Sequence, residues 1–201
     1  MTGGIACGKT LVARLLAEKG CVVRSADETA RALMSPGRAA WKRIVARFGP
    51  SILKPDRTID RARLGPLVFA DPSARRFLDR VVHPLVLAEH LRAVRRLERE
   101  GRSAIFVVEA ALTVEAGFTR HFDRVVVVHC RKEDQVRRLR SRDGLTRAEA
   151  LRRIGAQMPL REKLRHADYA LDASGTVAET VERAERLYAL LALDADLERA
   201  A

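Results

Sequence analysis

Short runs of β-branched and other apolar residues alternate along the chain with longer stretches in which apolar residues recur at helical spacing. This alternation is typical of an α/β protein with a parallel sheet. Four runs are predicted to be strands, residues 21–24, 104–108, 124–129 and 169–171. Residues 177–193 carry a helical apolar stripe and are expected to pack on the sheet.

Two further regions have helical patterns and no strong strand signal. Residues 35–99 are interrupted repeatedly by dipeptides that contain proline, and they are predicted to form a mostly helical insertion. Residues 133–165 are predicted to form two or three Arg-rich helices, broken at Asp143-Gly144 and Met158-Pro159. We expect this second region to fold over a bound nucleotide as a lid.

The segment of residues 3–10 reads GGIACGKT and matches the phosphate-binding pattern G-x-x-x-x-G-K-[ST] without a mismatch. In such a loop, backbone N–H groups converge on the phosphates, Lys9 reaches the outer phosphates and the Thr10 hydroxyl binds Mg²⁺. A Gly-rich turn before a helix is the competing interpretation, but the helical pattern begins at Leu11, where the motif requires it. The sequence therefore predicts a nucleoside triphosphate site, with Mg²⁺, that includes Gly3, Gly4, Ile5, Ala6, Cys7, Gly8, Lys9, Thr10 and Leu11.

A buried strand normally precedes such a loop, and here only Met1 and Thr2 precede it. A strand of about five buried apolar residues contributes on the order of 10 kcal/mol, which is comparable with the stability of a whole domain. We therefore expect the first strand to be missing, and we interpret the chain as beginning at an internal or misassigned start.

The chain has a formal net charge of +12. Nearly all of its basic residues are arginines spread along the predicted helices. Two explanations stay open, a general bias toward arginine and a site for a phosphate-rich substrate. A nucleic-acid partner is disfavoured, because one Trp, two Tyr and six Phe offer few platforms for stacking bases.

The three cysteines Cys7, Cys21 and Cys130 are scattered and form no C-x-x-C pair, which argues against a disulfide framework and a zinc site. The longest apolar run, residues 125–128, is too short to span a bilayer, and no signal-peptide pattern opens the chain. We expect a cytoplasmic protein with no membrane partner.

Asp27 follows the strand predicted at residues 21–24. The carboxyl ends of parallel strands line the ligand crevice of an open sheet, and a carboxylate there can accept a proton from an attacking hydroxyl. The competing interpretation is a helix cap, because residues 25–28 form a plausible helix start. The residues alone leave both interpretations open.

Short motifs follow one another in a characteristic order along nearly the whole chain. They include Thr2-Gly3-Gly4-Ile5 with Gly8-Lys9-Thr10, Ala26-Asp27, Ile59-Asp60-Arg61, His83-Pro84, Arg142-Asp143-Gly144, Gln157-Met158-Pro159 and Ala167-Asp168-Tyr169. Each motif is weak alone, but together they resemble the dephospho-CoA kinase family. The resemblance implies an α/β P-loop kinase with a parallel sheet, a helical substrate-binding insertion and a helical lid. It also implies ATP-dependent phosphorylation of the ribose 3′-hydroxyl of dephospho-CoA, with Mg²⁺, giving CoA and ADP.

The resemblance gives an expected organisation for the chain. We expect residues 1–201 to form a single domain, because 201 residues of 47% hydrophobic content can bury one sizeable core. The P-loop core is expected at residues 1–34, 100–132 and 167–201, the helical region for the CoA-like substrate at 35–99, and the lid at 133–166. The expected partners are ATP and dephospho-CoA, and the expected state is a monomer or a weak homo-oligomer.

The resemblance also implies roles for single residues. Asp27 falls on the family's catalytic base and is expected to help hold Mg²⁺ with Thr10, while Lys9 stabilises the transferred phosphoryl group. Arg142 of the predicted lid is expected to stack on adenine or to hold a phosphate, and Arg138 is a weaker candidate for the same task.

Arg61, His83 and Glu115 fall on positions expected to face the substrate. Plainer interpretations stay open for two of them: His83 as the cap of a helix end, and Arg61 as an ion-pair partner of Asp60 or Glu89.

Three departures from the family pattern bear on activity. Ser25 stands where the family has the first acid of a D-A-D motif, and residues 109–115 lack a proline of the family segment. Ala6 replaces a glycine, which we expect to be tolerated only if its φ is negative. The alternatives are therefore a truncated or inactive P-loop protein, a related nucleoside or nucleotide kinase, and a basic nucleic-acid-binding protein.

Overall fold

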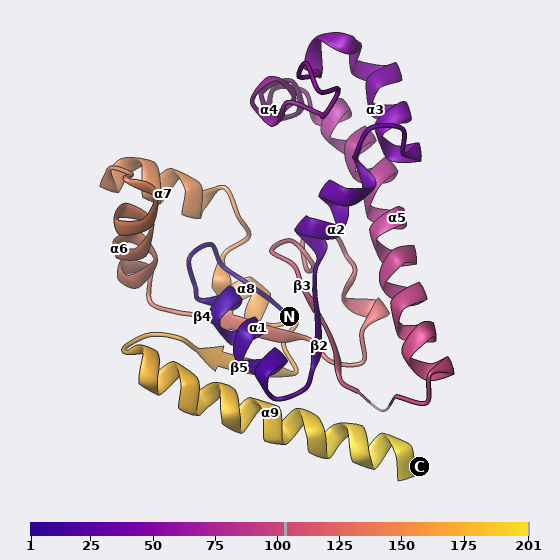
Figure 1. The fold of residues 1–201 in the computed structure, drawn as a ribbon. Coiled ribbons are helices and arrows are strands. Elements are labelled where there is room, and N and C mark those ends of the chain that lie inside the picture. The colour runs from indigo at the N-terminus through magenta and orange to yellow at the C-terminus, as the bar shows by residue number, and fades with distance from the viewer. Residues whose placement is uncertain (103, 201) are drawn as a thin grey trace. The chain divides into compact units, whose positions relative to one another are not determined.

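The computed structural model describes residues 1–102 and 104–200, with side chains through residue 196 (Figure 1). The chain divides into two compact units. The first combines Met1–Val23 with Ala104–Ala201, and the second is Arg24–Ser103. Each unit is described by itself below.

Five short strands form two sheets, one of three strands and one of two. Strands β1 (Thr2–Gly3), β4 (Val126–His129) and β5 (Tyr169–Asp172) are parallel neighbours in that order. Strand β2 (Val22–Ser25), which begins in this unit, pairs with β3 (Phe106–Glu109). The parallel pairing of β1, β4 and β5 confirms the predicted α/β class. The bounds of β2, β3, β4 and β5 lie within two residues of the four predicted runs.

Met1 joins the two groups of strands. Its backbone nitrogen donates a hydrogen bond to the Val108 carbonyl at 2.8 Å, and its carbonyl accepts one from the Ala110 N–H at 3.0 Å. Met1 thus links the β2-β3 pair to the sheet of order β1-β4-β5, beside its shortest strand, β1. The expectation that the first strand is missing is wrong, because Thr2 and Gly3 pair with Val127 and Val128.

Helices cover this sheet, and their bounds are α1 (Lys9–Glu18), α6 (Lys132–Asp143), α7 (Arg147–Gly155), α8 (Leu160–Leu164) and α9 (Val177–Ala200), with a short η2 turn (Thr119–His121). Figure 1 shows α9 running along the sheet next to α1 and β5, while α6 and α7 form an arm that stands off the sheet. The core packs Val12 and Leu16 of α1 against Val128, Leu171 and Leu187. The predicted C-terminal helix and the predicted helices of residues 133–165 are confirmed.

The predicted breaks between the last helices also have clear causes. Helix α6 ends at Gly144, which adopts a left-handed φ of 67° that glycine takes without strain. Thr146 and Glu149 then form a capping box that starts α7. Pro159 precedes α8, so the arm is divided where the sequence predicted.

The second unit is helical, as predicted for residues 35–99. Its elements are α2 (Ala26–Leu33), α3 (Ala39–Phe48), η1 (Pro50–Ile52), α4 (Arg61–Ala70) and α5 (Pro72–Arg99). Ile44, Ile52 and Val81 form the centre of its separate apolar core.

Proline has two different effects in this unit. Pro72 occupies the first turn of α5 behind the N-cap Asp71, where its missing N–H costs nothing. Pro66 and Pro84 lie inside helices, so they do not end them. The interpretation of His83 as a helix-end cap is therefore wrong.

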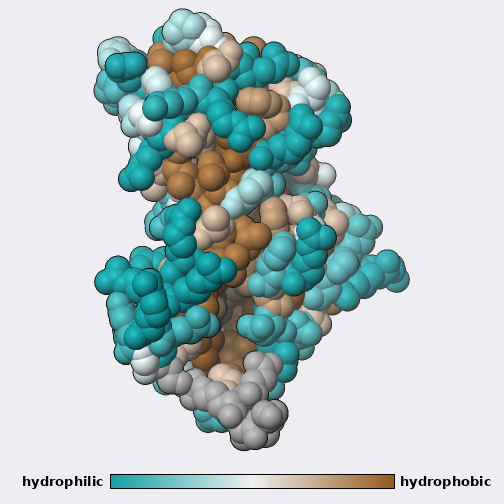
Figure 2. Space-filling model, turned by 90° about the vertical axis from the view of Figure 1, so that its right-hand side faces the viewer, coloured by the Kyte–Doolittle hydropathy of each residue, from teal (hydrophilic) through white to brown (hydrophobic). Residues whose placement is uncertain are grey.

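Polar side chains cover most of the face drawn in Figure 2, and apolar residues show between them. Within the described residues, no helix is both long and apolar enough to cross a membrane.

Candidate active site

The phosphate loop connects β1 to α1. Gly8 is the N-cap of α1 with a φ of 90°, a conformation that glycine adopts readily, so the first turn of the helix points its free N–H groups toward the loop. The Lys9 ammonium lies over the same loop, donating to the Gly4 carbonyl at 2.9 Å and to the Gly3 carbonyl at 3.4 Å. The loop thus brings together backbone N–H groups, the positive end of a helix and an ammonium group. This arrangement favours the binding of a phosphate group.

Ala6 has a φ of 57°, so the negative φ on which the tolerance of alanine was expected to depend is not found at this position. The Cys7 N–H donates to the Gly4 carbonyl at 3.3 Å and closes a turn with Ile5 and Ala6 at its centre. The third residue of such a turn takes a positive φ when the turn is of type II, which explains why glycine is favoured there. Alanine in this conformation costs roughly 1–2 kcal/mol.

Cys7 contributes its backbone rather than its side chain to the loop surface. The side chain is fully buried against Cys130, with the two sulfur atoms 3.5 Å apart. The hydrogen bond from the Cys130 thiol lowers the pKa of Cys7. Leu11 lies on α1 beyond the loop and is half-buried.

Thr10 and Glu109 bring two hard oxygen donors together beside the loop. The Thr10 hydroxyl donates to Glu109 Oε1 at 3.1 Å, from the first turn of α1 to the end of β3. Sequence reasoning named Thr10 as a metal ligand but did not bring Glu109 beside it. The available signal was an acidic residue directly after a buried strand.

The donor set of this pair fits Mg²⁺. Magnesium is commonly held by one or two carboxylates or hydroxyls together with water and substrate phosphates. No group of three or more His, Cys, Asp or Glu side chains that could hold a metal by itself occurs in the described residues. The pair is therefore suited to a metal that arrives with a nucleotide.

A basic cleft lies between the loop and α6. It has a volume of about 530 Å³, and its lining residues are Ala6, Gly8, Lys9, Thr10, Arg137, Arg138, Ser141 and Arg142. Arg142, predicted to bind ATP, thus shares the cleft with Lys9 and Thr10. Its guanidinium forms a two-pronged ion pair with Asp143, at 2.7 and 3.1 Å.

Arg138 connects the loop to the end of the sheet. Its guanidinium donates to the Ala6 carbonyl at 3.3 Å and to the Ala173 carbonyl at 2.6 Å. The first of these hydrogen bonds holds the carbonyl group of the strained residue Ala6 in place. Arg138 is therefore tied to the loop in a way that its sequence position did not indicate.

Asp27 lies in the first turn of α2, in the second unit, and is exposed. The interpretation of Asp27 as a helix cap is wrong, since the N-cap is Ser25, whose hydroxyl accepts from the Glu28 N–H at 3.3 Å. The Ser25 that departs from the family pattern thus has a structural role. The carboxylate of Asp27 has no role in capping.

Arg61 lines an apolar pocket of about 440 Å³ in the second unit. Met34, Ile59 and Leu64 contribute to its apolar wall, and Arg31 lies on its edge with Arg61. The proposed partners of Arg61 bind other arginines, since Asp60 pairs with Arg63 and Glu89 with Arg92. The ion-pair interpretation of Arg61 is therefore wrong.

His83 and Glu115 lie apart from both pockets. His83 lies inside α5, with Nε2 3.6 Å from Asp79 Oδ1. Glu115 is largely buried, and its Oε1 lies 2.7 Å from the ammonium of the fully buried Lys163. That contact satisfies the distance for an ion pair without the geometry of a hydrogen bond. Lys163 also donates to the Ala111 carbonyl at 2.8 Å.

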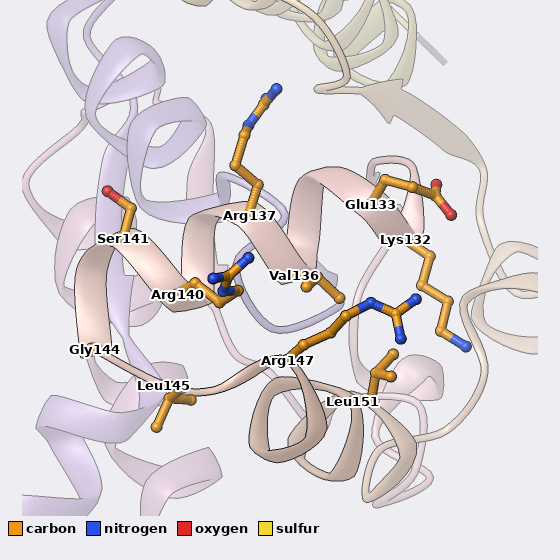
Figure 3. Close-up of a pocket in the computed structure, with 10 residues that line it drawn as sticks. All are labelled: Lys132, Glu133, Val136, Arg137, Arg140, Ser141, Gly144, Leu145, Arg147 and Leu151. Carbon is orange, nitrogen blue, oxygen red and sulfur yellow. The ribbon is translucent and has the colours of Figure 1, made fainter.

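A second groove runs between α6 and α7. Figure 3 shows Arg147 lying between the two helices, while Arg137 points away from the groove. Lys132, Arg140 and Arg147 have no ion pair within the part of the chain that the structure describes. Exposed arginines without an ion pair also occur in the second unit, so unpaired charge alone does not mark this groove as a binding site.

Comparison with known proteins gives a consistent result. The family model described as dephospho-CoA kinase matches residues 1–179. A dephospho-CoA kinase of Geobacter sulfurreducens is 47% identical over 191 residues, which cover 94% of this chain and 95% of the relative. One from Geobacillus kaustophilus is 43% identical, covering 90% of this chain and 89% of the relative.

Solved structures agree with these relatives. The crystal structure of TT1252 from Thermus thermophilus has a TM-score of 0.79 at 34% identity, covering 95% of this chain and 94% of that one. The dephospho-CoA kinase from Campylobacter jejuni has a TM-score of 0.68 at 29% identity, covering 92% of each chain. This chain belongs to the dephospho-CoA kinase family.

Proposed function

We propose that this protein transfers a phosphoryl group from ATP to the ribose 3′-hydroxyl of dephospho-CoA, giving CoA and ADP. The observation that carries the proposal is the basic cleft that Lys9 and Thr10 of the phosphate loop line together with Arg142 of α6. Family membership supports dephospho-CoA as the acceptor and favours it over another nucleoside or nucleotide.

Within the cleft, the loop N–H groups and Lys9 bind the β- and γ-phosphates. Lys9 neutralises negative charge on the transferred group, which lowers the energy of the transition state. Arg142 holds a phosphate or stacks on adenine, and its pair with Asp143 fixes its orientation. The Thr10 hydroxyl and Glu109 hold Mg²⁺, which when bound neutralises charge on the phosphates.

Asp27 orients the ribose 3′-hydroxyl and accepts its proton as the oxygen attacks phosphorus. Its exposure and its freedom from capping support this assignment, because the carboxylate is available to a ligand. We also propose that it contributes to the Mg²⁺ site, as the family resemblance implies.

The apolar pocket in the second unit is proposed to hold part of dephospho-CoA. Its wall suits the uncharged pantetheine arm, and the guanidinium groups of Arg31 and Arg61 suit the pyrophosphate. His83 and Glu115 stay predicted substrate contacts. A monomeric or weakly oligomeric state, a cytoplasmic location and the lack of a nucleic-acid partner also stay predictions.

The experiment that tests this function is product analysis after incubation of the purified chain with ATP, Mg²⁺ and dephospho-CoA. Asp27→Asn should lower turnover by about 100- to 10,000-fold, the range for loss of a general base, and leave the ATP dissociation constant within about twofold. Glu28→Gln, which neutralises the next exposed carboxylate of the same helix turn, is the matched control and should keep full turnover.

The outcomes separate the alternatives. CoA formation that depends on Asp27 supports the proposal. Tight ATP binding without CoA formation, but with phosphorylation of another nucleoside, would instead identify a related kinase. An absence of ATP binding would identify an inactive member of the family.

A further inference from the structure

One residue of the phosphate loop is held on both of its backbone groups by side-chain amides. The Ile5 N–H donates to Gln157 Oε1 at 2.7 Å, and the Ile5 carbonyl accepts from Gln135 Nε2 at 2.8 Å. Ile5 lies at the centre of the turn closed by Gly4 and Cys7, where its own N–H and carbonyl have no partner inside the turn. The two glutamines therefore satisfy polar groups that the turn leaves unpaired.

The contacts are tightly packed. Gln135 is only 2% exposed, and a Cβ added to Gly4 would lie 2.7 Å from its Nε2. The same added atom would lie 3.1 Å from Leu160 of α8. An amide buried in this way is costly unless it forms hydrogen bonds, so the position of the Gln135 side chain is closely defined.

The two glutamines lie at opposite ends of the helical arm. Gln135 is in the first turn of α6, and Gln157 lies between α7 and α8. In Figure 1 the α6–α7 arm leaves the sheet next to the loop and returns to it at α8. Both ends of the arm thus meet at the same loop residue, while residues 136–156 extend between them.

From these contacts we infer that Gln135 and Gln157 are positioning residues that hold the phosphate loop in its ATP-binding form and anchor both ends of the arm. Movement of the arm over a nucleotide is then confined to residues 136–156. This inference rests on the proposed function only in that ATP is the ligand of the loop.

The first test measures the loop directly, by amide hydrogen exchange at Ile5 in the full chain without nucleotide. Gln157→Met removes the acceptor at similar side-chain length, and exchange at Ile5 should become about tenfold faster. Gln157→Glu keeps an acceptor oxygen and should retain the protection. Equal exchange in the wild type and in Gln157→Met would overturn the inference.

The second test separates positioning from a general effect on folding. Gln157→Met should raise the dissociation constant and the KM for ATP by about five- to tenfold, while the KM for dephospho-CoA stays unchanged. A residue that only stabilises the fold would lower the fraction of active enzyme and leave both KM values as they are, which would contradict the inference. Arg161→Gln, at an exposed position of α8, is the matched control.

A double variant tests whether the glutamines act through one residue. Gln135→Leu and Gln157→Met should each weaken ATP binding, and the double variant should lose less than the product of the two single effects. Strictly multiplicative losses would show that the two side chains act independently, against the inference. The ATP dissociation constant and the exchange rate at Ile5 can be measured without turnover, so both tests work even if the enzyme lacks the proposed activity.

Discussion

The phosphate-binding part of the first unit and the helical second unit are stabilised in different ways. Around the loop, side chains from distant segments bind backbone groups, as Gln135, Arg138 and Gln157 do. The second unit instead packs an apolar cluster around Ile44 and leaves Arg31 and Arg61 at the edge of its pocket without ion pairs among the described residues. The comparison shows that the phosphate loop is preorganised by internal contacts, whereas the pocket of the second unit has two guanidinium groups on its lining that no ion pair among the described residues holds in place.

Removing a buried charge gives the largest expected effect on the first unit. Lys163→Met leaves the buried Glu115 carboxylate without its counter-ion, and loss of one partner of a buried pair costs about 3–5 kcal/mol of unfolding free energy. Urea denaturation measures this loss. Adding Glu115→Leu to Lys163→Met should restore more than half of it, and Arg161→Met on the same helix is the exposed control. A double variant as unstable as Lys163→Met would show that the ion pair is not the cause.

The next effect is on catalysis at the preorganised site. Lys9→Met should lower kcat by about 100- to 1,000-fold, the range for loss of one group that stabilises transition-state charge. The Lys9 ammonium reaches the Gly3 and Gly4 carbonyls across the loop, so a small change in thermal stability is also expected. Steady-state kinetics with calorimetry separates the two effects. A kcat within tenfold of the wild type would place Lys9 outside the reacting centre.

Features that depend on local sequence could be predicted, and features that depend on long-range contacts could not. The phosphate loop binds through its backbone, so its spacing of glycines, Lys9 and Thr10 identified it without knowledge of the fold. The strands and helices followed from apolar periodicity. The hydrogen bonds of Met1 to Val108 and Ala110 could not be predicted, because they join segments more than 100 residues apart.

Side-chain contacts over long sequence separations were equally hidden. Glu109 became a candidate metal ligand only when the end of β3 was found beside Thr10, and the roles of Gln135 and Gln157 required the path of the helical arm. At His83 a local pattern was misleading. The His-Pro pair was interpreted as a helix end, but Pro84 lies within a 28-residue helix.

In the second unit, the expected effect is on substrate binding rather than on turnover. Arg61→Ala should raise the KM for dephospho-CoA by about tenfold, the equivalent of one charge-assisted hydrogen bond, and leave kcat and the KM for ATP unchanged. Arg63→Ala is the contrasting variant, because Arg63 binds Asp60 and the Ser51 carbonyl and should affect stability instead. An unchanged KM for dephospho-CoA in Arg61→Ala would remove this pocket from the substrate site.

A buried histidine gives the second unit a pH dependence. Burial lowers the pKa of His90 below its usual value of 6.5, with Arg24 acting in the same direction and Glu89 opposing it. Thr29 Oγ1 lies 3.1 Å from its Nε2. As the pH falls through 6.5 the unfolded chain takes up this proton first, so stability is lost until the pH passes below the folded-state pKa. Urea midpoints between pH 8 and 5 should therefore fall more in the wild type than in His90→Gln, and equal slopes would contradict the assignment.

The smallest expected effect is a change in stability caused by a substitution in the phosphate loop. Ala6 has a φ of 57°, which costs an alanine roughly 1–2 kcal/mol, whereas glycine adopts it without strain but loses about 0.5–1 kcal/mol more conformational entropy on folding. Ala6→Gly should therefore stabilise the folded chain by about 0.5–1 kcal/mol, measured by urea denaturation. Glycine at the exposed residue 148 of α7, Ala148→Gly, is the control and should destabilise by a similar amount. Equal losses in both variants would show that Ala6 is not strained and that the loop is held less rigidly than its contacts indicate.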